Sequence, residues 1–206
     1  MSVLHGDVAR DGMHATATDA PPLSDAALLA EVHAGNEAAF EALFGRYYGP
    51  IHNLLQRLAE DEADDLAQEV FWRLYTKPPR ALQGDLRAWL YRVATRLGYN
   101  ALRARRRRER QRERWATLTG GADEDRSPSP EAAFEQEAER QRVRDTLARL
   151  KRREAMLLAL RYSGLSYGEI AQALHVAPGS VGTLLARAER AFAALYDAPQ
   201  ERGGGA

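Results

Sequence analysis

One stretch near the carboxyl end constrains the fold more than any other part of the chain. It reads Gly164-Leu-Ser-Tyr-Gly-Glu-Ile-Ala-Gln-Ala-Leu-His-Val-Ala-Pro-Gly-Ser-Val-Gly-Thr-Leu-Leu-Ala-Arg-Ala-Glu-Arg190. Ser166, followed three residues later by Glu169, forms a capping box, so a helix is predicted to begin at Tyr167. A tight turn follows, and Pro178 suits the first position of a new helix. The stretch therefore predicts two short helices joined by a turn.

The second of these helices has a buried stripe and a side of small residues. Its apolar residues recur at i, i+4 and i+7, as Val181, Leu185 and Ala188. At its start the other side carries the small residues Gly179, Ser180, Gly182 and Thr183. A helix with so little bulk in its first turn can approach another surface closely, and in a helix-turn-helix that surface is the DNA major groove. The same pattern fits an ordinary pair of helices in a helical core, so the rest of the chain has to decide.

Composition excludes several classes of protein. The 206 residues allow one large domain or two small ones, and a hydrophobic content of 45% supports packed cores. The absence of Cys excludes disulfides and Cys-based zinc sites and fits a cytoplasmic location. No apolar run approaches membrane-spanning length, so no membrane insertion is expected. The five His residues form no metal-binding pair and no nucleophile motif is present, so we expect no metal, no cofactor and no enzymatic activity.

The net charge of zero hides a strong segregation of charge. Residues 1–70 hold three basic and thirteen acidic side chains, whereas residues 87–114 hold eleven Arg against two Glu. Residues 123–139 are acidic again. Such blocks favour two different partners, one met by an acidic face and one by a basic face.

The acidic part of the chain leads into a predicted helix over residues 66–76. At 100° per residue its apolar residues cluster on one side. The far side carries Asp65, Gln68, Glu69 and Trp72. A tryptophan among acids and an amide, opposite the buried stripe, is typical of a protein-docking face. The alternative is that Trp72 packs under the adjacent loop.

A basic helix is predicted from Leu86 into the arginine block. One side carries Leu86, Trp89, Leu90, Val93, Leu97 and Ala101. The other faces carry Arg92, Thr95, Arg96, Asn100 and Arg103. Bases, an amide and a hydroxyl interleaved on one helix suit phosphates and unstacked bases. The block Arg105–Arg108, with Arg110, Arg112 and Arg114, fits either a solvated helix end or general attraction to a nucleic-acid backbone.

No stretch alternates convincingly with period two, so the predicted fold class is all-α. The Gly, Ser and Pro-rich stretch before residue 131 indicates a linker. We therefore expect two small helical domains joined by a flexible linker, the C-terminal one with a helix-turn-helix. The expected boundaries are a disordered N-terminus (1–22), a first domain (23–114), the linker (115–130), a second domain (131–197) and a disordered tail (198–206).

Three pieces of sequence in this order carry a family resemblance. They are Asp64-Asp-Leu-Ala-Gln-Glu-Val-Phe-Trp-Arg-Leu74, Leu86-Arg-Ala-Trp-Leu-Tyr-Arg-Val-Ala-Thr-Arg-Leu97, and the helix-turn-helix stretch. Over about residues 23–195 the chain resembles a bacterial RNA polymerase sigma factor of the extracytoplasmic-function (ECF) group. The resemblance implies core RNA polymerase and promoter DNA as partners. Many members of this group are held inactive by an anti-sigma factor, which adds a third partner to the expectation.

The resemblance also implies a role for each face. The Asp65, Gln68, Glu69 and Trp72 face would dock on the coiled coil of the largest polymerase subunit. The helix that carries Arg92, Thr95, Arg96, Asn100 and Arg103, together with the 77–85 loop, would melt the promoter −10 element and capture its non-template strand. The helix-turn-helix would read the −35 element through Gly179, Ser180, Thr183, Arg187 and Arg190.

Some residues depart from the family pattern. Gly182, Leu184 and Glu189 stand where the family often carries basic residues. Arg187 and Arg190 then remain as the main phosphate ligands, which predicts weaker or less salt-dependent −35 binding. Thr95-Arg96 replaces the usual Arg-Asn pair and leaves the −10 preference open.

Two other functions fit part of the pattern. A helix-turn-helix regulator that binds DNA without polymerase explains the C-terminal stretch, but it does not explain Trp72 on an acidic face. An inhibitor that occupies the sigma site on polymerase would share the docking face without needing the DNA-reading residues.

Overall fold

The computed structural model describes residues 23–79, 85–119 and 131–198. Within these ranges every regular element is a helix and none is a strand, which confirms the all-α prediction. None of the described helices is long and apolar enough to cross a bilayer. The predicted disordered ends, residues 120–130 of the linker and residues 80–84 of the loop lie outside the described residues.

The first helical unit contains four α-helices and a short 3₁₀ turn. They are α1 (Asp25–His33), α2 (Glu37–Leu58), the turn Glu60–Glu62, α3 (Ala63–Thr76) and α4 (Leu86–Thr119). The side chains of Ser24 and Asn36 cap α1 and α2, as their positions in the sequence predict. Helix α2 runs on through Pro50 without restarting. Helix α4 continues to Thr119, several residues into the segment that the sequence had assigned to the linker.

The second unit ends in the helix-turn-helix. Its elements are α5 (Glu131–Arg149), α6 (Arg152–Tyr162), α7 (Tyr167–Leu174), the 3₁₀ turn Pro178–Ser180 and α8 (Val181–Tyr196). The predicted capping box is present: the Ser166 hydroxyl accepts from the Glu169 amide at 3.3 Å, and the Glu169 carboxylate accepts from the Ser166 amide at 2.7 Å. His175 ends α7 in the left-handed region with φ of 52°, which makes the tight turn into α8.

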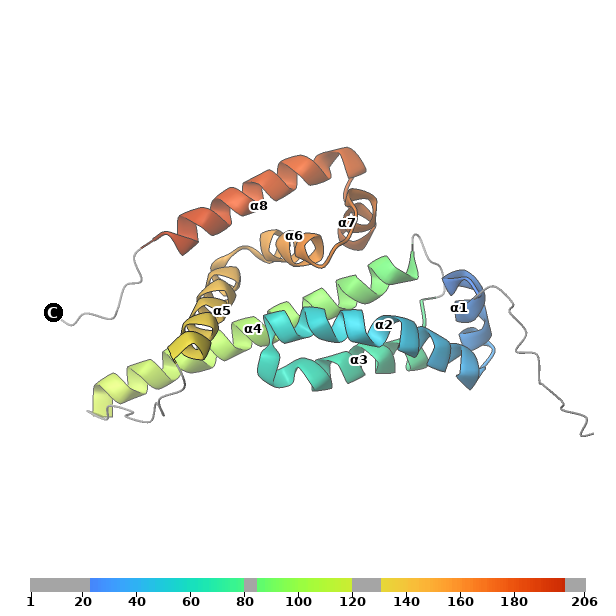
Figure 1. Ribbon diagram of the computed structural model, residues 1–206, viewed down its shortest axis with the longest axis horizontal. Helices are drawn as coiled ribbons and strands as arrows, with labels where there is room; N and C mark the ends of the chain where they lie inside the picture. Colours follow the sequence, from blue (N-terminus) through green and yellow to red (C-terminus); the bar gives the residue numbers. More distant parts are fainter. Residues whose placement is uncertain (1–22, 80–84, 120–130, 199–206) are drawn as a thin grey trace, which may run out of the picture.

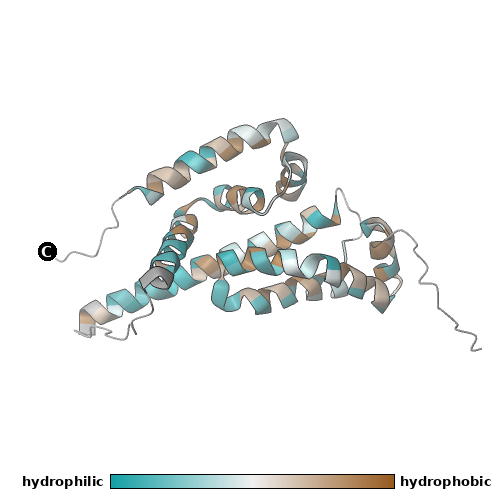
Figure 2. Cartoon of the chain, viewed as in Figure 1, coloured by the Kyte–Doolittle hydropathy of each residue, from teal (hydrophilic) through white to brown (hydrophobic). Residues whose placement is uncertain are grey.

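The two units pack against each other through α4. Figure 1 shows the long green helix α4 running between α2 and α3 on one side and α6 and α7 on the other. The buried residues of both units form one continuous apolar cluster. In Figure 2 the apolar residues lie mainly on the facing sides of the helices, while hydrophilic residues follow the free end of α4.

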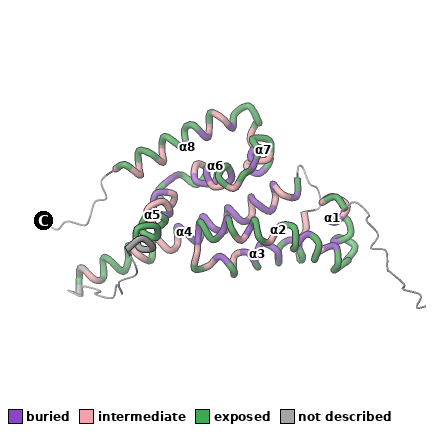
Figure 3. The backbone as a smooth tube through the Cα atoms, in the orientation of Figure 1, coloured by how far each residue is buried: buried purple, intermediate pink, exposed green. Residues whose placement is uncertain are grey.

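Helix α4 is buried on two sides, whereas the sequence predicted one. The second side contains Tyr91, Thr95 and Tyr99, spaced four residues apart, and all three are buried. Figure 3 shows purple, buried segments along most of the central part of α4. Periodicity missed this side because its residues carry polar atoms. Those atoms are hydrogen-bonded inside the protein: the Thr95 hydroxyl donates to the Tyr91 carbonyl and the Tyr99 hydroxyl donates to the Leu150 carbonyl.

Close packing of α4 on α2 depends on Gly98. A Cβ atom at this position would lie 2.9 Å from Cδ1 of Leu58, so a larger residue would require the Leu58 side chain or the helices to shift. Packing is looser where α2 meets the second unit. There a cavity of about 400 Å³ is lined mainly by apolar side chains, among them Leu54, Leu147, Leu158 and Phe192.

Candidate functional site

The predicted docking residues lie together on the outer face of α3. Asp65, Gln68 and Trp72 are exposed and Glu69 is half-buried. The Trp72 side chain is 61% exposed, and residues 80–84 of the adjacent loop lie outside the described residues. Glu69 accepts a hydrogen bond from Nε of Arg73 at 2.6 Å, which holds its carboxylate at the edge of the face. An exposed indole with acidic neighbours can anchor a basic or amphipathic partner surface.

Sequence reasoning missed the aromatic residues beside this face. A shallow groove is lined by Phe40 and Phe44 of α2, by Phe71 and Tyr75 of α3, and by the four predicted residues. The ring centroids of Phe40 and Tyr75 are 5.2 Å apart, and those of Trp72 and Tyr75 are 6.2 Å apart. We call this the aromatic groove. Phe40 and Phe44 lie four residues apart on the same side of α2, and Phe44 is exposed at the surface.

The predicted polar face of α4 is only partly as expected. Arg96, Asn100 and Arg103 are exposed and Arg92 is half-buried. Thr95 departs from the prediction, because it is only 1% exposed and its hydroxyl donates to the Tyr91 carbonyl at 2.6 Å. At 100° per residue Thr95 lies on the second buried side of α4, away from the four other residues. It is therefore not a surface residue in this arrangement.

Helix α4 contacts the helix-turn-helix directly. Arg92 contacts Nε2 of His175 in the turn, and burial lowers the pKa of the Arg92 guanidinium. Arg87 forms an ion pair with Glu169 at the start of α7. The backbone amide of Asp85 donates to Oε1 of Gln172 at 3.2 Å. These contacts bring a candidate DNA-binding residue of one unit against the turn of the other.

Glu169 both caps α7 and pairs with α4 at this junction, and both interactions affect its pKa. Burial raises the pKa of Glu169, but the hydrogen bonds from Ser166 and the charge of Arg87 outweigh burial and hold the pKa below its usual value. The carboxylate thus stays ionised while it caps α7 and pairs with α4.

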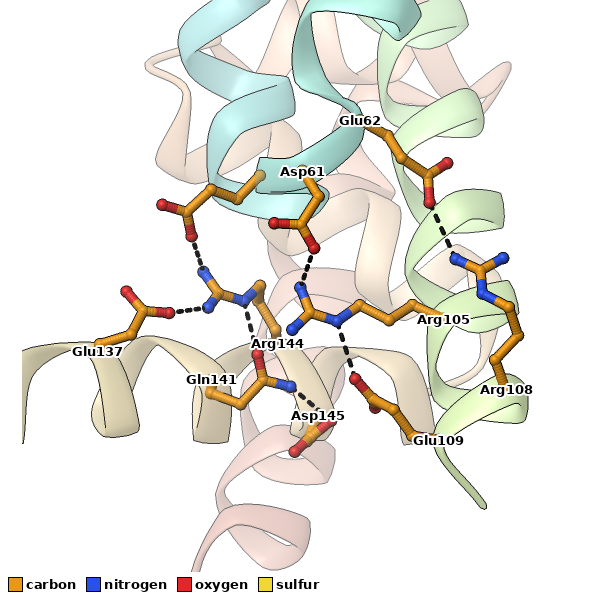
Figure 4. A network of polar contacts seen from close by, with 10 residues as sticks. Asp61, Glu62, Arg105, Arg108, Glu109, Glu137, Gln141, Arg144 and Asp145 are labelled. Atoms are coloured by element: carbon orange, nitrogen blue, oxygen red, sulfur yellow. Dashed lines mark hydrogen bonds and ion pairs between the residues drawn. The ribbon is translucent and has the colours of Figure 1, made fainter. Parts of the chain in front are cut away.

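Part of the arginine block is paired within the protein. Figure 4 shows Arg105 between Asp61 and Glu109, at 3.1 Å and 2.8 Å, and Arg108 against Glu62 at 3.0 Å. The acidic turn after α2 therefore neutralises a share of the basic charge on α4. These residues of the two charge blocks meet each other in the folded chain, a contact that the sequence analysis did not predict.

The same network ties the two units together. Arg144 of α5 is only 4% exposed and pairs with Glu60 of the turn at 3.1 Å and with Glu137 of its own helix. Burial, and then the nearby charge of Glu109, raise the pKa of Asp145 beside it. A buried cation held by acids from both units fixes their relative position.

The helix-turn-helix presents its predicted residues to solvent. Val181, Leu185 and Ala188 are buried, as predicted. The five candidate DNA-reading residues are all exposed: Gly179 and Ser180 lie in the 3₁₀ turn before α8, and Thr183, Arg187 and Arg190 share one side of α8 at 100° per residue. This side is therefore accessible to a partner within the part of the chain that the structure describes.

Comparison with known proteins identifies both units. Residues 43–108 match Sigma-70 region 2 and residues 140–192 match Sigma-70 region 4, and together these matches cover more than half of the chain. The chain belongs to the sigma-70 family. It carries regions 2 and 4 in this order and is a sigma factor.

Two solved structures resemble this sigma factor. CnrH, solved in complex with the cytosolic domain of CnrY, has 22% identity and a TM-score of 0.55, covering 85% of this chain and 98% of that chain. The sigma factor RpoE from Bartonella quintana, solved with the anti-sigma factor NepR, has 20% identity and a TM-score of 0.47, covering 78% and 98%. Sequence comparison with curated proteins finds no significant match.

As a sigma factor, the protein works with core RNA polymerase and directs promoter recognition at the start of transcription. Among the described residues, no group of three His, Cys, Asp or Glu side chains is arranged to hold a metal ion.

Proposed function

We propose that this sigma factor docks on core RNA polymerase through the aromatic groove and the Asp65, Gln68, Glu69 and Trp72 face beside it. The observation that carries the proposal is the exposure of Trp72, since burying an indole on a partner is among the largest single contributions at protein interfaces. The surrounding carboxylates suit a basic partner surface.

The exposed face of α4 is proposed to hold the −10 element. Arg92, Arg96, Asn100 and Arg103 offer three guanidinium groups and one amide along the same helix face. Guanidinium groups bind phosphates and stack on bases, so the face suits a melted strand. Thr95 is left out of this set while its hydroxyl is bonded inside the protein.

The exposed side of α8 is proposed to read the −35 element. Small side chains at Gly179, Ser180 and Thr183 let its first turn enter the major groove, and Arg187 and Arg190 reach the phosphates. Both recognition tasks and the docking are binding events, so the proposed function involves no catalysis by this chain. It takes place in the cytoplasm, where polymerase and promoter meet.

The closed arrangement of the two units is proposed to be the form free of polymerase. His175 in the helix-turn-helix contacts Arg92 on α4, so the two candidate DNA surfaces are adjacent. The −10 and −35 elements lie about 25 base pairs apart, or about 85 Å at 3.4 Å per pair. One promoter can therefore occupy both surfaces only after the units separate. An unchanged distance between probes on α3 and α8 in free protein and holoenzyme would contradict this.

An anti-sigma factor is proposed as a third partner. CnrH, which shares the fold, was solved in complex with the cytosolic domain of CnrY. The apolar cavity between α2, α5, α6 and α8 offers a partner protein a site that touches both units. Purifying the chain from uninduced cells tests this proposal, and recovery of no protein other than core polymerase would count against it.

Transcription assays test the main proposal against its alternative. Purified chain with core polymerase should give run-off transcripts from a subset of a promoter library, and core polymerase alone should not. In gel shifts without polymerase the chain should bind the same promoters poorly. Tight binding by the chain alone, with no effect on polymerase, would instead indicate a stand-alone regulator.

A further inference from the structure

A stripe of arginines continues along α4 beyond the residues proposed to hold the −10 element. At 100° per residue, one 60° sector of the helix contains Arg92, Arg96, Arg103, Arg107, Arg110 and Arg114. The last two lie outside the part of the chain that matches Sigma-70 region 2. At 1.5 Å per residue the stripe is about 33 Å long, close to one turn of B-form DNA.

The distal half of the stripe differs from the rest of the arginine block. Arg105 and Arg108 are engaged by acids of the turn and of α4, and Arg106 donates to the Asp145 carbonyl. Arg107, Arg110 and Arg114 are exposed, and among the described residues none of the three has an acidic partner within ion-pair distance. The fold thus sorts the block into cations that hold the structure and cations that face solvent.

We infer that Arg107, Arg110 and Arg114 form a binding track for the phosphates of duplex promoter DNA between the −10 and −35 elements. The inference rests on the proposed assignment of the −10 element to the first half of α4. From there the chain passes along the stripe into residues 120–130 and then to the unit proposed to read the −35 element. In chain order the distal half of the stripe thus lies between the two proposed recognition surfaces, which is where the spacer would lie once the units separate.

The chemistry of the track matches a duplex backbone. Guanidinium groups bind phosphates without reading sequence, and the three arginines span about 10 Å, the reach of about three phosphates along one strand. In Figure 2 hydrophilic residues predominate along the part of α4 that carries these arginines, while the exposed Trp115 and Leu118 lie at its end. Contacts of this kind also offset the shortage of basic residues on α8.

Salt dependence of holoenzyme binding tests the inference. Each of R107Q, R110Q and R114Q should lower the slope of log K against log salt by about 0.9 on a full promoter duplex, and the triple variant by about 2.7. The matched control is R112Q, because Arg112 is equally exposed but lies on the opposite side of α4. The control should leave the slope unchanged. The triple Lys variant should keep most of the wild-type slope, since it keeps the charges.

A second template separates this inference from the proposed function. Binding of holoenzyme to a single-stranded −10 oligonucleotide should be weakened by R96Q but not by the triple variant. If the triple variant leaves the slope of log K against log salt on the promoter duplex unchanged, the inferred binding track is wrong. Loss of oligonucleotide binding or of core polymerase binding in that variant also overturns it, because the arginines then face the melted strand or a protein. If the wild-type holoenzyme shows no promoter preference, or if R96Q does not weaken binding to the single-stranded −10 oligonucleotide, the proposed function is wrong instead.

Discussion

Replacing Trp72 by Ala should weaken binding of core RNA polymerase by about a hundredfold. A tryptophan buries up to about 250 Å², and its 61% exposed fraction in the free protein leaves about 150 Å² for a partner. At about 25 cal/mol per Å² this area corresponds to about 4 kcal/mol. Fixing the side chain on binding costs about 1 kcal/mol, which leaves about 3 kcal/mol. A loss of this size is in the range of interface hot spots.

The free protein should tolerate the same substitution. Because Trp72 lies mostly in solvent, its removal leaves the buried residues of α3 in place, and the free energy of unfolding should change by less than about 1 kcal/mol. The matched control is Trp115→Ala on the distal part of α4, where the side chain is 62% exposed. Trp115 is far along the sequence from the docking face, so this control should bind core polymerase as the wild type does.

Fluorescence anisotropy of labelled protein titrated with core polymerase, without DNA, measures both affinities. Urea unfolding of each variant measures stability. If Trp72→Ala binds within twofold of the wild type, or no more weakly than Trp115→Ala, the aromatic groove is not the docking site. The combination of Trp72→Ala with Glu69→Ala should impair assembly further, because the carboxylate beside the indole is also lost.

Three further predictions concern DNA reading, pH and the junction between the units. Arg187→Ala should weaken holoenzyme binding about equally across a −35 library, whereas Thr183→Ala should change the sequence preference; identical profiles for both would refute the groove assignment. Because the pKa of Glu169 is held below its usual value of 4.5, its stabilisation should be fully present above about pH 4.5 and lost as pH falls through the lowered pKa. Urea unfolding between pH 3 and 7 should show this loss in the wild type and a flatter profile in Glu169→Gln. Tyr99→Phe should lower the free energy of unfolding by about 1–3 kcal/mol, since it leaves the buried Leu150 carbonyl without its donor; calorimetry with no change would contradict the role of that bond.

Local signals in the sequence were sufficient to predict where helices begin and which side of a helix is exposed. Ser24, Asn36 and Ser166 cap helices at the positions where their side chains predict a start, because capping depends on neighbours three residues away or closer. The exposure of Trp72 followed from helical periodicity alone. These features need no information about distant parts of the chain.

The same reasoning could not predict the contacts between the units. Thr95 looked like a surface residue because its hydroxyl is polar, yet the carbonyl one turn earlier satisfies it and the helix is covered on that side. Arg105 and Arg108 looked like free cations because their partners, Asp61 and Glu62, lie more than forty residues earlier. Periodicity within one helix carries no information on which faces a second unit covers.

If the units open as proposed, polymerase and promoter would replace the contacts at the junction between them. Its ion pairs use Arg87 and Arg144, cations that water or phosphate can satisfy after opening, and the cavity beside α2 means that little close packing is lost there. Opening also frees Arg92 from His175. Each ligand that binds only the open form shifts the equilibrium by its differential affinity. Docking on polymerase raises the effective concentration of both DNA surfaces at one promoter, so two contacts that are weak singly suffice together.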